Sequence, residues 1–372
     1  MGSPYAFTVV HRRHIVRKAL FLSFVIASGL SSRRAVGQEN SPYTFHVYTN
    51  LAQQPALVLD QNNNPLPPYT REQFDLSLDH GPLFHPTHIR LEGDDPITLF
   101  VLLDASGRAA NLMKVASNAI ASLASLSLTP RDHVAIFAFD CAVSRGTNLV
   151  AGDSETLTSS VRDALEYPGI HGPKNTAGSC FRSRRLWDAL ATLTNAIAAE
   201  PGRRVVVALT DGVDHDSKDT WNEVRENAVN KSVAIFGIRG DSFVPPTALG
   251  SSMATPGQIG TASYNDPEDR FELLCHGSGG IVLEASAKAL PKTLQHVIEL
   301  LRGRYILEYP RPSNVTSGFH LIDIKVPQRG AVVIGTGVSM KLATAKEVDD
   351  PNTIPPDPSR APTLGTRKPM SH

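Results

Sequence analysis

The sequence has little excess of either charge and few cysteines. Its 372 residues contain 36 Lys and Arg against 36 Asp and Glu, so the formal net charge is zero. A nucleic-acid-binding protein normally carries a basic excess or a basic patch, so this balance argues against that class. Beyond the N-terminal region, no apolar run is long enough to span a bilayer.

Signatures of common enzyme classes are also missing. The chain has no Gly-x-Ser-x-Gly, no His-Glu-x-x-His, no phosphate-binding loop and no Gly-x-Gly-x-x-Gly. An aspartate after a buried strand, here Asp104, also begins aspartate-nucleophile phosphatases, but those have a second aspartate where Ser106 stands. Cys275 and His276 are adjacent on a predicted helix, so their side chains diverge. The sequence favours a non-enzymatic protein; a metal-dependent hydrolase or phosphatase using Asp104 is the alternative.

The N-terminus has the pattern of an export signal. A basic segment is followed by an apolar run over Ala19–Leu30 and by the small-x-small tripeptide Ala35-Val36-Gly37. This order predicts a signal peptide over residues 1–37 and a secreted or periplasmic protein. An uncleaved anchor is the alternative, although the apolar run is short for one. Arg12-Arg13 leaves twin-arginine export open beside the general route.

The chain has only three cysteines, Cys141, Cys180 and Cys275. An odd number leaves at least one thiol unpaired within a monomer. If an exported chain forms a bridge, Cys141–Cys180 is the expected pair, because both residues fall in loops near the same predicted sheet edge. Cys275 falls within a predicted helix, as a small core residue. Three unpaired thiols are the alternative.

Two short apolar runs, each ending in an aspartate, stand at the centre of the sequence. Six apolar residues and a threonine lead from Ile97 into Asp104, and Val205 to Thr210 leads into Asp211. Such runs predict strands buried on both faces. Ligands of open α/β sheets bind at the carboxyl edge of the strands, where these aspartates should lie.

The pattern of elements divides the chain into several parts. Strands and helices alternate over residues 96–302, which predicts an α/β fold with a doubly wound, mostly parallel sheet. Residues 38–95 and 303–342 are rich in strand patterns and should join in one accessory β-sandwich. Residues 343–372 form a Pro-rich tail that should be disordered. Within the α/β part, Asp266-Pro267 predicts the start of a helix.

Several motifs, in order, resemble the von Willebrand factor A (vWA) domain, and more closely a bacterial family of secreted proteins that carry it. Single motifs are weak, but their order and spacing over residues 42–340 are specific. They are Tyr69–Phe74, Asp104-Ala105-Ser106, Leu186–Leu190, Leu209–Gly212 and Arg304–Pro310.

This resemblance implies a divalent cation at the carboxyl edge of the sheet. In such domains two serines and a threonine ligate Mg²⁺, aspartates bind mainly through water, and an acidic partner residue completes the shell. Here Asp104, Ser106 and Asp211 match the pattern. Arg108 stands at the second serine position, and Arg184 stands two residues before Leu186, where the threonine is expected. A guanidinium cannot ligate a metal and stays charged.

Two arrangements are compatible with these residues. In one, Arg108 points away, and Asp104, Ser106 and Asp211 hold Mg²⁺ weakly. In the other, Arg108 or Arg184 pairs with the aspartates and no metal binds. The replacement of hydroxyls by fixed positive charges favours the second arrangement.

Both arrangements leave a polar surface suited to a binding partner. The expected function is therefore that of an exported, non-enzymatic protein that binds other proteins or peptides through a degenerate metal-ion-dependent adhesion site. Arg108, Arg184 and Arg185 suggest an acidic partner, with ordinary solvated loop charge as the alternative for these arginines. A structural envelope component without a specific partner is a further alternative.

Overall fold

The computed structural model describes residues 51–106, 109–146, 149–167, 184–241, 269–312, 318–336, 338–340 and 361–365. The chain divides into two compact units, Met1–Phe45 and His46–His372, and all described residues belong to the second unit. The signal peptide expected over residues 1–37 lies outside the described residues and stays a prediction.

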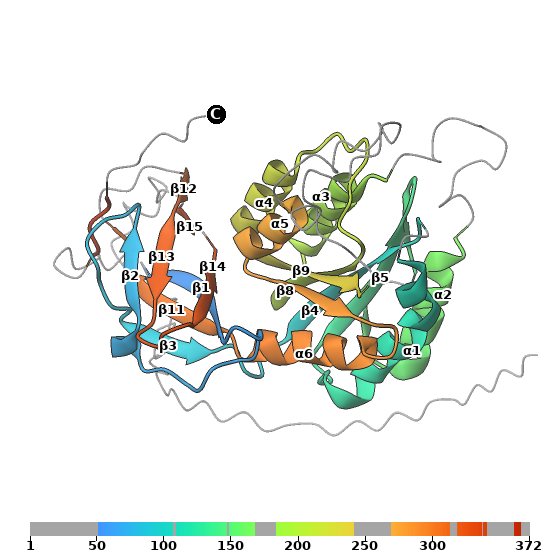
Figure 1. Ribbon diagram of the computed structural model, residues 1–372, viewed down its shortest axis with the longest axis horizontal. Coiled ribbons are helices and arrows are strands. Elements are labelled where there is room, and N and C mark those ends of the chain that lie inside the picture. Colours follow the sequence, from blue (N-terminus) through green and yellow to red (C-terminus); the bar gives the residue numbers. More distant parts are fainter. Residues whose placement is uncertain are drawn as a thin grey trace, which may run out of the picture. The chain divides into compact units, whose positions relative to one another are not determined.

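A mostly parallel sheet forms the centre of the α/β part (Figure 1). Its strands are β4 (Ile97–Asp104), β5 (His133–Phe139), β6 (Val143–Arg145), β7 (Val150–Ala151), β8 (Arg203–Leu209), β9 (Val233–Gly240) and β10 (Val282–Ala285). They lie in the order β10-β9-β8-β4-β5-β6, and β7 also pairs with β5. The four pairings from β10 to β5 are parallel, whereas β6 and β7 run antiparallel to β5.

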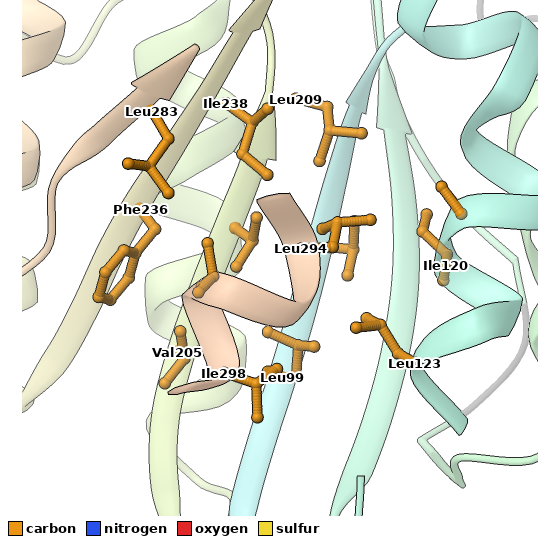
Figure 2. Packing of buried hydrophobic residues seen from close by; sticks show 14 of the residues in the cluster. Leu99, Ile120, Leu123, Val205, Leu209, Phe236, Ile238, Leu283, Leu294 and Ile298 are labelled. Carbon is orange, nitrogen blue, oxygen red and sulfur yellow. The ribbon is translucent and has the colours of Figure 1, made fainter. Parts of the chain in front are cut away.

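Helices cover both faces of this sheet, because its central strands are apolar on both sides. In β4, Leu99, Val101 and Leu103 join one core cluster, while Phe100 and Leu102 join the other. The first cluster contains α1 (Ala110–Leu126), α2 (Ser154–Leu165) and α6 (Leu290–Arg302), and the second contains α3 (Leu186–Ile197), α4 (Trp221–Asn230) and α5 (Arg270–Ser278). Figure 2 shows Leu294 and Ile298 of α6 over the strands. The doubly wound fold expected from the sequence is confirmed.

The segments that flank the α/β part combine into antiparallel β structure. Its elements are β1 (Leu51–Leu59), β2 (Asp75–Leu78), β3 (His88–Leu91), β11 (Tyr305–Pro310), β12 (Gly318–His320), β13 (Ile322–Lys325), β14 (Val332–Gly335) and β15 (Val338–Met340), with a 3-10 turn at Arg71–Gln73. One sheet has the order β14-β1-β11-β3, and β2–β13 and β12–β15 form two-stranded sheets. Residues of the first two sheets share one apolar core, so the N- and C-terminal flanks build a common sandwich as expected.

Part of the C-terminal tail differs from the expected disorder. Residues 361–365 lie against the β-sandwich: the backbone N–H of Gly365 donates to the carbonyl of Leu78 at 3.0 Å, and Leu364 packs against the sandwich core. Two glycines, Gly81 and Gly365, allow this close approach because neither carries a side chain. A contact that depends on missing side chains leaves no apolar period in the sequence.

One helix begins later than expected. The sequence predicts a start at Asp266-Pro267, which lies outside the described residues, but α5 has Asp269 as its N-cap. The Asp269 carboxylate accepts a hydrogen bond from the backbone of Glu272 at 3.0 Å and pairs with both terminal nitrogens of Arg239, at the end of β9. The ion pair with Arg239, which is distant in the sequence, therefore holds the residue at which α5 begins.

Candidate functional site

The sheet brings Asp104 and Asp211 to the same edge. β4 and β8 are parallel neighbours in register from Ile97 and Arg203 to Leu103 and Leu209. Asp104 ends β4, and Thr210 and Asp211 directly follow β8. The Thr210 hydroxyl donates to Asp104 Oδ2 at 2.8 Å, which joins the two strand ends directly. Both expected acidic residues therefore lie on a common rim.

The Asp104 side chain is buried, and both of its oxygens accept hydrogen bonds from neighbouring residues of the chain. Its side chain accepts from the backbone and hydroxyl of Ser106 at Oδ1 and from Thr210 at Oδ2, and the residue is only 1% exposed. Burial raises the pKa of Asp104, and the nearby charge of Asp211 adds to this, while the bonds from Ser106 and Thr210 oppose it. Thr210 belongs to the Leu-Thr-Asp-Gly motif, but the sequence pattern does not predict its hydrogen bond between the ends of β4 and β8.

Arg184 forms an ion pair with Asp211. Its Nη1 donates to Asp211 Oδ2 at 3.2 Å, and the two side chains are only 10% and 11% exposed. The backbone of Val213 donates to the other Asp211 oxygen at 2.9 Å. The backbone carbonyl of Arg184 accepts from His215 at 2.7 Å, so the arginine is also held by the loop that follows β8. A guanidinium thus stands beside the carboxylate that a cation would approach.

The loop after β8 is tied to the start of α3. Asp214 accepts hydrogen bonds from the backbone of Trp187 at 3.1 Å and from the Ser217 hydroxyl. Asp188 accepts in turn from the backbone of Lys218 and Asp219, at 2.7 and 3.0 Å. Burial raises the pKa of Asp214, and its hydrogen bonds oppose that rise. This network holds the segment that carries Arg184 against the segment that carries Asp211.

The neighbouring arginines have different surroundings. Arg184 is buried, whereas Arg185, the residue before α3, is exposed. Arg108 lies outside the described residues, so its pairing with an aspartate stays a prediction. Of the three arginines expected to meet a partner, Arg185 is the one that the described structure places at the surface.

Cysteine usage agrees in part with the expected bridge. Cys141 is disulfide-bonded, and Cys275 is a free thiol buried in α5. Burial raises the pKa of the Cys275 thiol far above its usual range, which makes it a poor nucleophile. The expected partner of Cys141, Cys180, lies outside the described residues.

The described residues at the rim do not by themselves fit a magnesium site. Mg²⁺ needs several hard oxygen ligands in octahedral geometry. Arg184 holds one oxygen of Asp211, and both oxygens of Asp104 already accept hydrogen bonds from the chain. Across the described ranges, no group of three or more His, Cys, Asp or Glu side chains could hold a metal ion. The expected ligands Asp104, Ser106 and Asp211 do gather, and the Arg184 guanidinium lies beside Asp211.

Comparison with solved structures finds distant matches that each cover part of this chain. Neither the known protein-family models nor the sequences of curated proteins match this chain. A proximal thread matrix protein from the mussel byssus is 12% identical with a TM-score of 0.42, over 60% of this chain and 51% of its own. BatB from Bacteroides thetaiotaomicron is 15% identical with a TM-score of 0.38, over 55% and 98%. A von Willebrand factor type A structure from Catenulispora acidiphila is 10% identical with a TM-score of 0.39, over 77% and 74%.

These similarities are too low to carry a functional conclusion, and the chain spans about half the length of the mussel protein. Another structure of that protein has zinc in its MIDAS motif. The α/β part nevertheless has the doubly wound architecture that the sequence predicts: a six-stranded path, mostly parallel, with helices on both faces and two aspartates at the carboxyl edge. Among the described helices, none is long and apolar enough to cross a membrane.

Proposed function

We propose that this protein is an exported, non-enzymatic module that binds a protein or peptide partner at the rim formed by the ends of β4 and β8. The rim is a degenerate metal-ion-dependent adhesion site in which Arg184 supplies the positive charge of the missing cation. Binding is therefore independent of Mg²⁺. The inferred partner is acidic, on the ground that Arg185, which directly follows the buried Arg184, is exposed.

The observation that carries this proposal is the buried pair between Arg184 and Asp211. A buried carboxylate needs a compensating charge, which a metal supplies in one class of site and a guanidinium supplies here. Arginine stays charged at any physiological pH and binds through fixed N–H groups. The rim thus keeps its electrostatic balance without a dissociable ion.

Two further features support export and the absence of catalysis. The disulfide at Cys141 suits an oxidising compartment outside the cytoplasm. Asp104, the nucleophile of the alternative hydrolase or phosphatase, is buried, and both of its oxygens are engaged by Ser106 and Thr210. A carboxylate held in this way is poorly placed to attack a substrate.

The metal part of the proposal is tested by restoring the missing hydroxyls. We expect the melting temperature of the wild-type chain to be the same in Mg²⁺ and in EDTA. The double variant Arg108→Ser, Arg184→Thr should gain a Mg²⁺-dependent rise, about 2.7 kcal/mol of stabilisation at a hundredfold excess over Kd. A Mg²⁺-dependent rise in the wild type would contradict the proposal.

The partner is tested with immobilised synthetic peptides rich in Asp and Glu. The wild-type chain should be retained in EDTA, and Arg185→Glu should lose retention. Arg329→Glu, which changes another exposed arginine in the β-sandwich, is the matched control and should behave as wild type. If wild-type chain is not retained, or if both variants are retained equally, the rim is not a binding site for acidic chains.

A further inference from the structure

A short part of the C-terminal tail is docked on the β-sandwich as a ligand would be. Gly365 donates its backbone N–H to the Leu78 carbonyl at 3.0 Å, Pro362 is buried, and Leu364 packs against the sandwich core. The Thr363 side chain between them is exposed. Alternating buried and exposed positions joined by a backbone hydrogen bond are typical of peptides recognised in an extended form.

The fit depends on two glycines, one from each side of the contact. A Cβ added at Gly365 would lie 2.0 Å from the Asp79 carbonyl oxygen and 2.5 Å from the Gly81 nitrogen. A Cβ added at Gly81 would lie 2.6 Å from the Thr363 carbonyl oxygen. Neither backbone could tolerate a side chain without moving, so the site selects a glycine at this place in its ligand.

The receiving surface is held by contacts that do not involve the tail. Asp79 and His80 both have positive φ, 49° and 59°, which is uncommon for residues with side chains. Asp79 exchanges backbone and side-chain hydrogen bonds with Leu321, at 2.8 and 3.0 Å, and its other carboxylate oxygen lies 2.7 Å from Nδ1 of buried His320. The strained turn is therefore shaped in advance and keeps its form when the tail leaves.

We propose that the turn at Asp79–Gly81 and the carboxyl end of β2 at Leu78 form a second binding site, specific for the segment Pro362-Thr363-Leu364-Gly365. The segment occupies the site in its own chain, and the same segment of a second copy takes it when the first is displaced. Residues 341–360 could span at most about 70 Å, which is enough to reach a neighbouring molecule. Attachment in the same chain gives a local concentration on the order of millimolar, so exchange is confined to crowded conditions.

The site is tested in the full-length chain with a labelled synthetic peptide of residues 358–368. In Gly365→Val the tail can no longer dock, so the vacated site should bind the peptide, measured by fluorescence anisotropy. Wild-type chain, whose site is occupied, should bind on the order of tenfold more weakly. A peptide carrying Gly365→Val should not bind, whereas one carrying Thr363→Ala should bind as well as wild type.

Cooperative thermal unfolding of Gly365→Val shows that the variant is folded, and Leu364→Asp offers a second way to release the tail should that variant fail. If folded, vacated chains bind neither peptide, or bind the Gly365→Val peptide equally well, the site does not exist.

Exchange between copies is tested by mixing two defective variants. Gly81→Ala blocks the site but keeps a good tail, and Gly365→Val keeps the site but lacks the tail. Each alone should sediment as a monomer, whereas the concentrated mixture should contain a heterodimer. Peptide binding without any heterodimer would overturn the exchange between copies. These outcomes do not depend on the rim at Asp104 and Asp211, because the two surfaces share no residue.

Discussion

Loss of the Arg184 guanidinium should destabilise the protein strongly. Arg184→Met keeps most of the aliphatic volume but removes the guanidinium that pairs with the buried Asp211 carboxylate. Breaking a buried pair in this way costs about 3–5 kcal/mol. The hydrogen bond from the backbone N–H of Val213 to Asp211 remains and satisfies one carboxylate oxygen. We therefore expect a loss of unfolding free energy near the lower end of this range, about 3 kcal/mol.

The assay is urea unfolding followed by circular dichroism, with a fall in the midpoint and an unchanged slope. The double variant Arg184→Met, Asp211→Asn removes both charges and should recover to within about 1 kcal/mol of wild type, which is about 2 kcal/mol more stable than Arg184→Met alone. Arg185→Met, the exposed neighbour, is the matched control and should change stability by less than about 0.5 kcal/mol. A loss below about 1 kcal/mol in Arg184→Met, or a double variant no more stable than Arg184→Met, would refute a charge-compensating role for Arg184.

Two further predictions concern the same edge of the sheet. The folded-state pKa of Asp104 lies above its ordinary value of 3.8, so stability is fully kept below that pH and declines as pH rises towards the folded pKa. Asp104→Asn should remove this decline, which is at most about 1.4 kcal/mol per pH unit. The free energy of unfolding is measured by urea titration at a series of pH values. Parallel pH profiles for the two proteins would argue against a raised pKa of Asp104. Gly212 has φ +80°, and an added Cβ would lie 2.6 Å from Phe271 and 2.7 Å from Arg239. Gly212→Ala should therefore cost about 3 kcal/mol of unfolding free energy in the same assay. Gly93 also has positive φ but open space around it, so Gly93→Ala is the control and should cost about 1 kcal/mol. Equal costs for the two variants would mean that crowding at Gly212 is unimportant.

The sequence predicts the sheet and the position of its acidic residues because the deciding information is local. β4 and β8 are apolar runs buried on both faces, and parallel neighbours must end at a common edge. The ion pair of Arg184 with an aspartate is one of the two arrangements that the sequence allows. Arg184 stands two residues before α3, where the resemblance to vWA domains implies a hydroxyl.

Other features depend on partners distant in the chain. Thr210 donates to a residue on another strand, and Asp269 begins α5 while paired with Arg239 from β9. Neither contact leaves a periodic pattern in the sequence. The docked tail is harder still to foresee, because Gly81 and Gly365 act by having no side chains.

The most direct measurement of the central claim is the electron density at the rim in crystals grown with Mn²⁺, whose anomalous scattering marks any bound ion. With Arg184 in place of the metal, we predict guanidinium density next to Asp211 and no anomalous peak between Asp104 and Asp211. An anomalous peak about 2.1 Å from Ser106 or from either aspartate, with Arg184 turned away, would contradict the account.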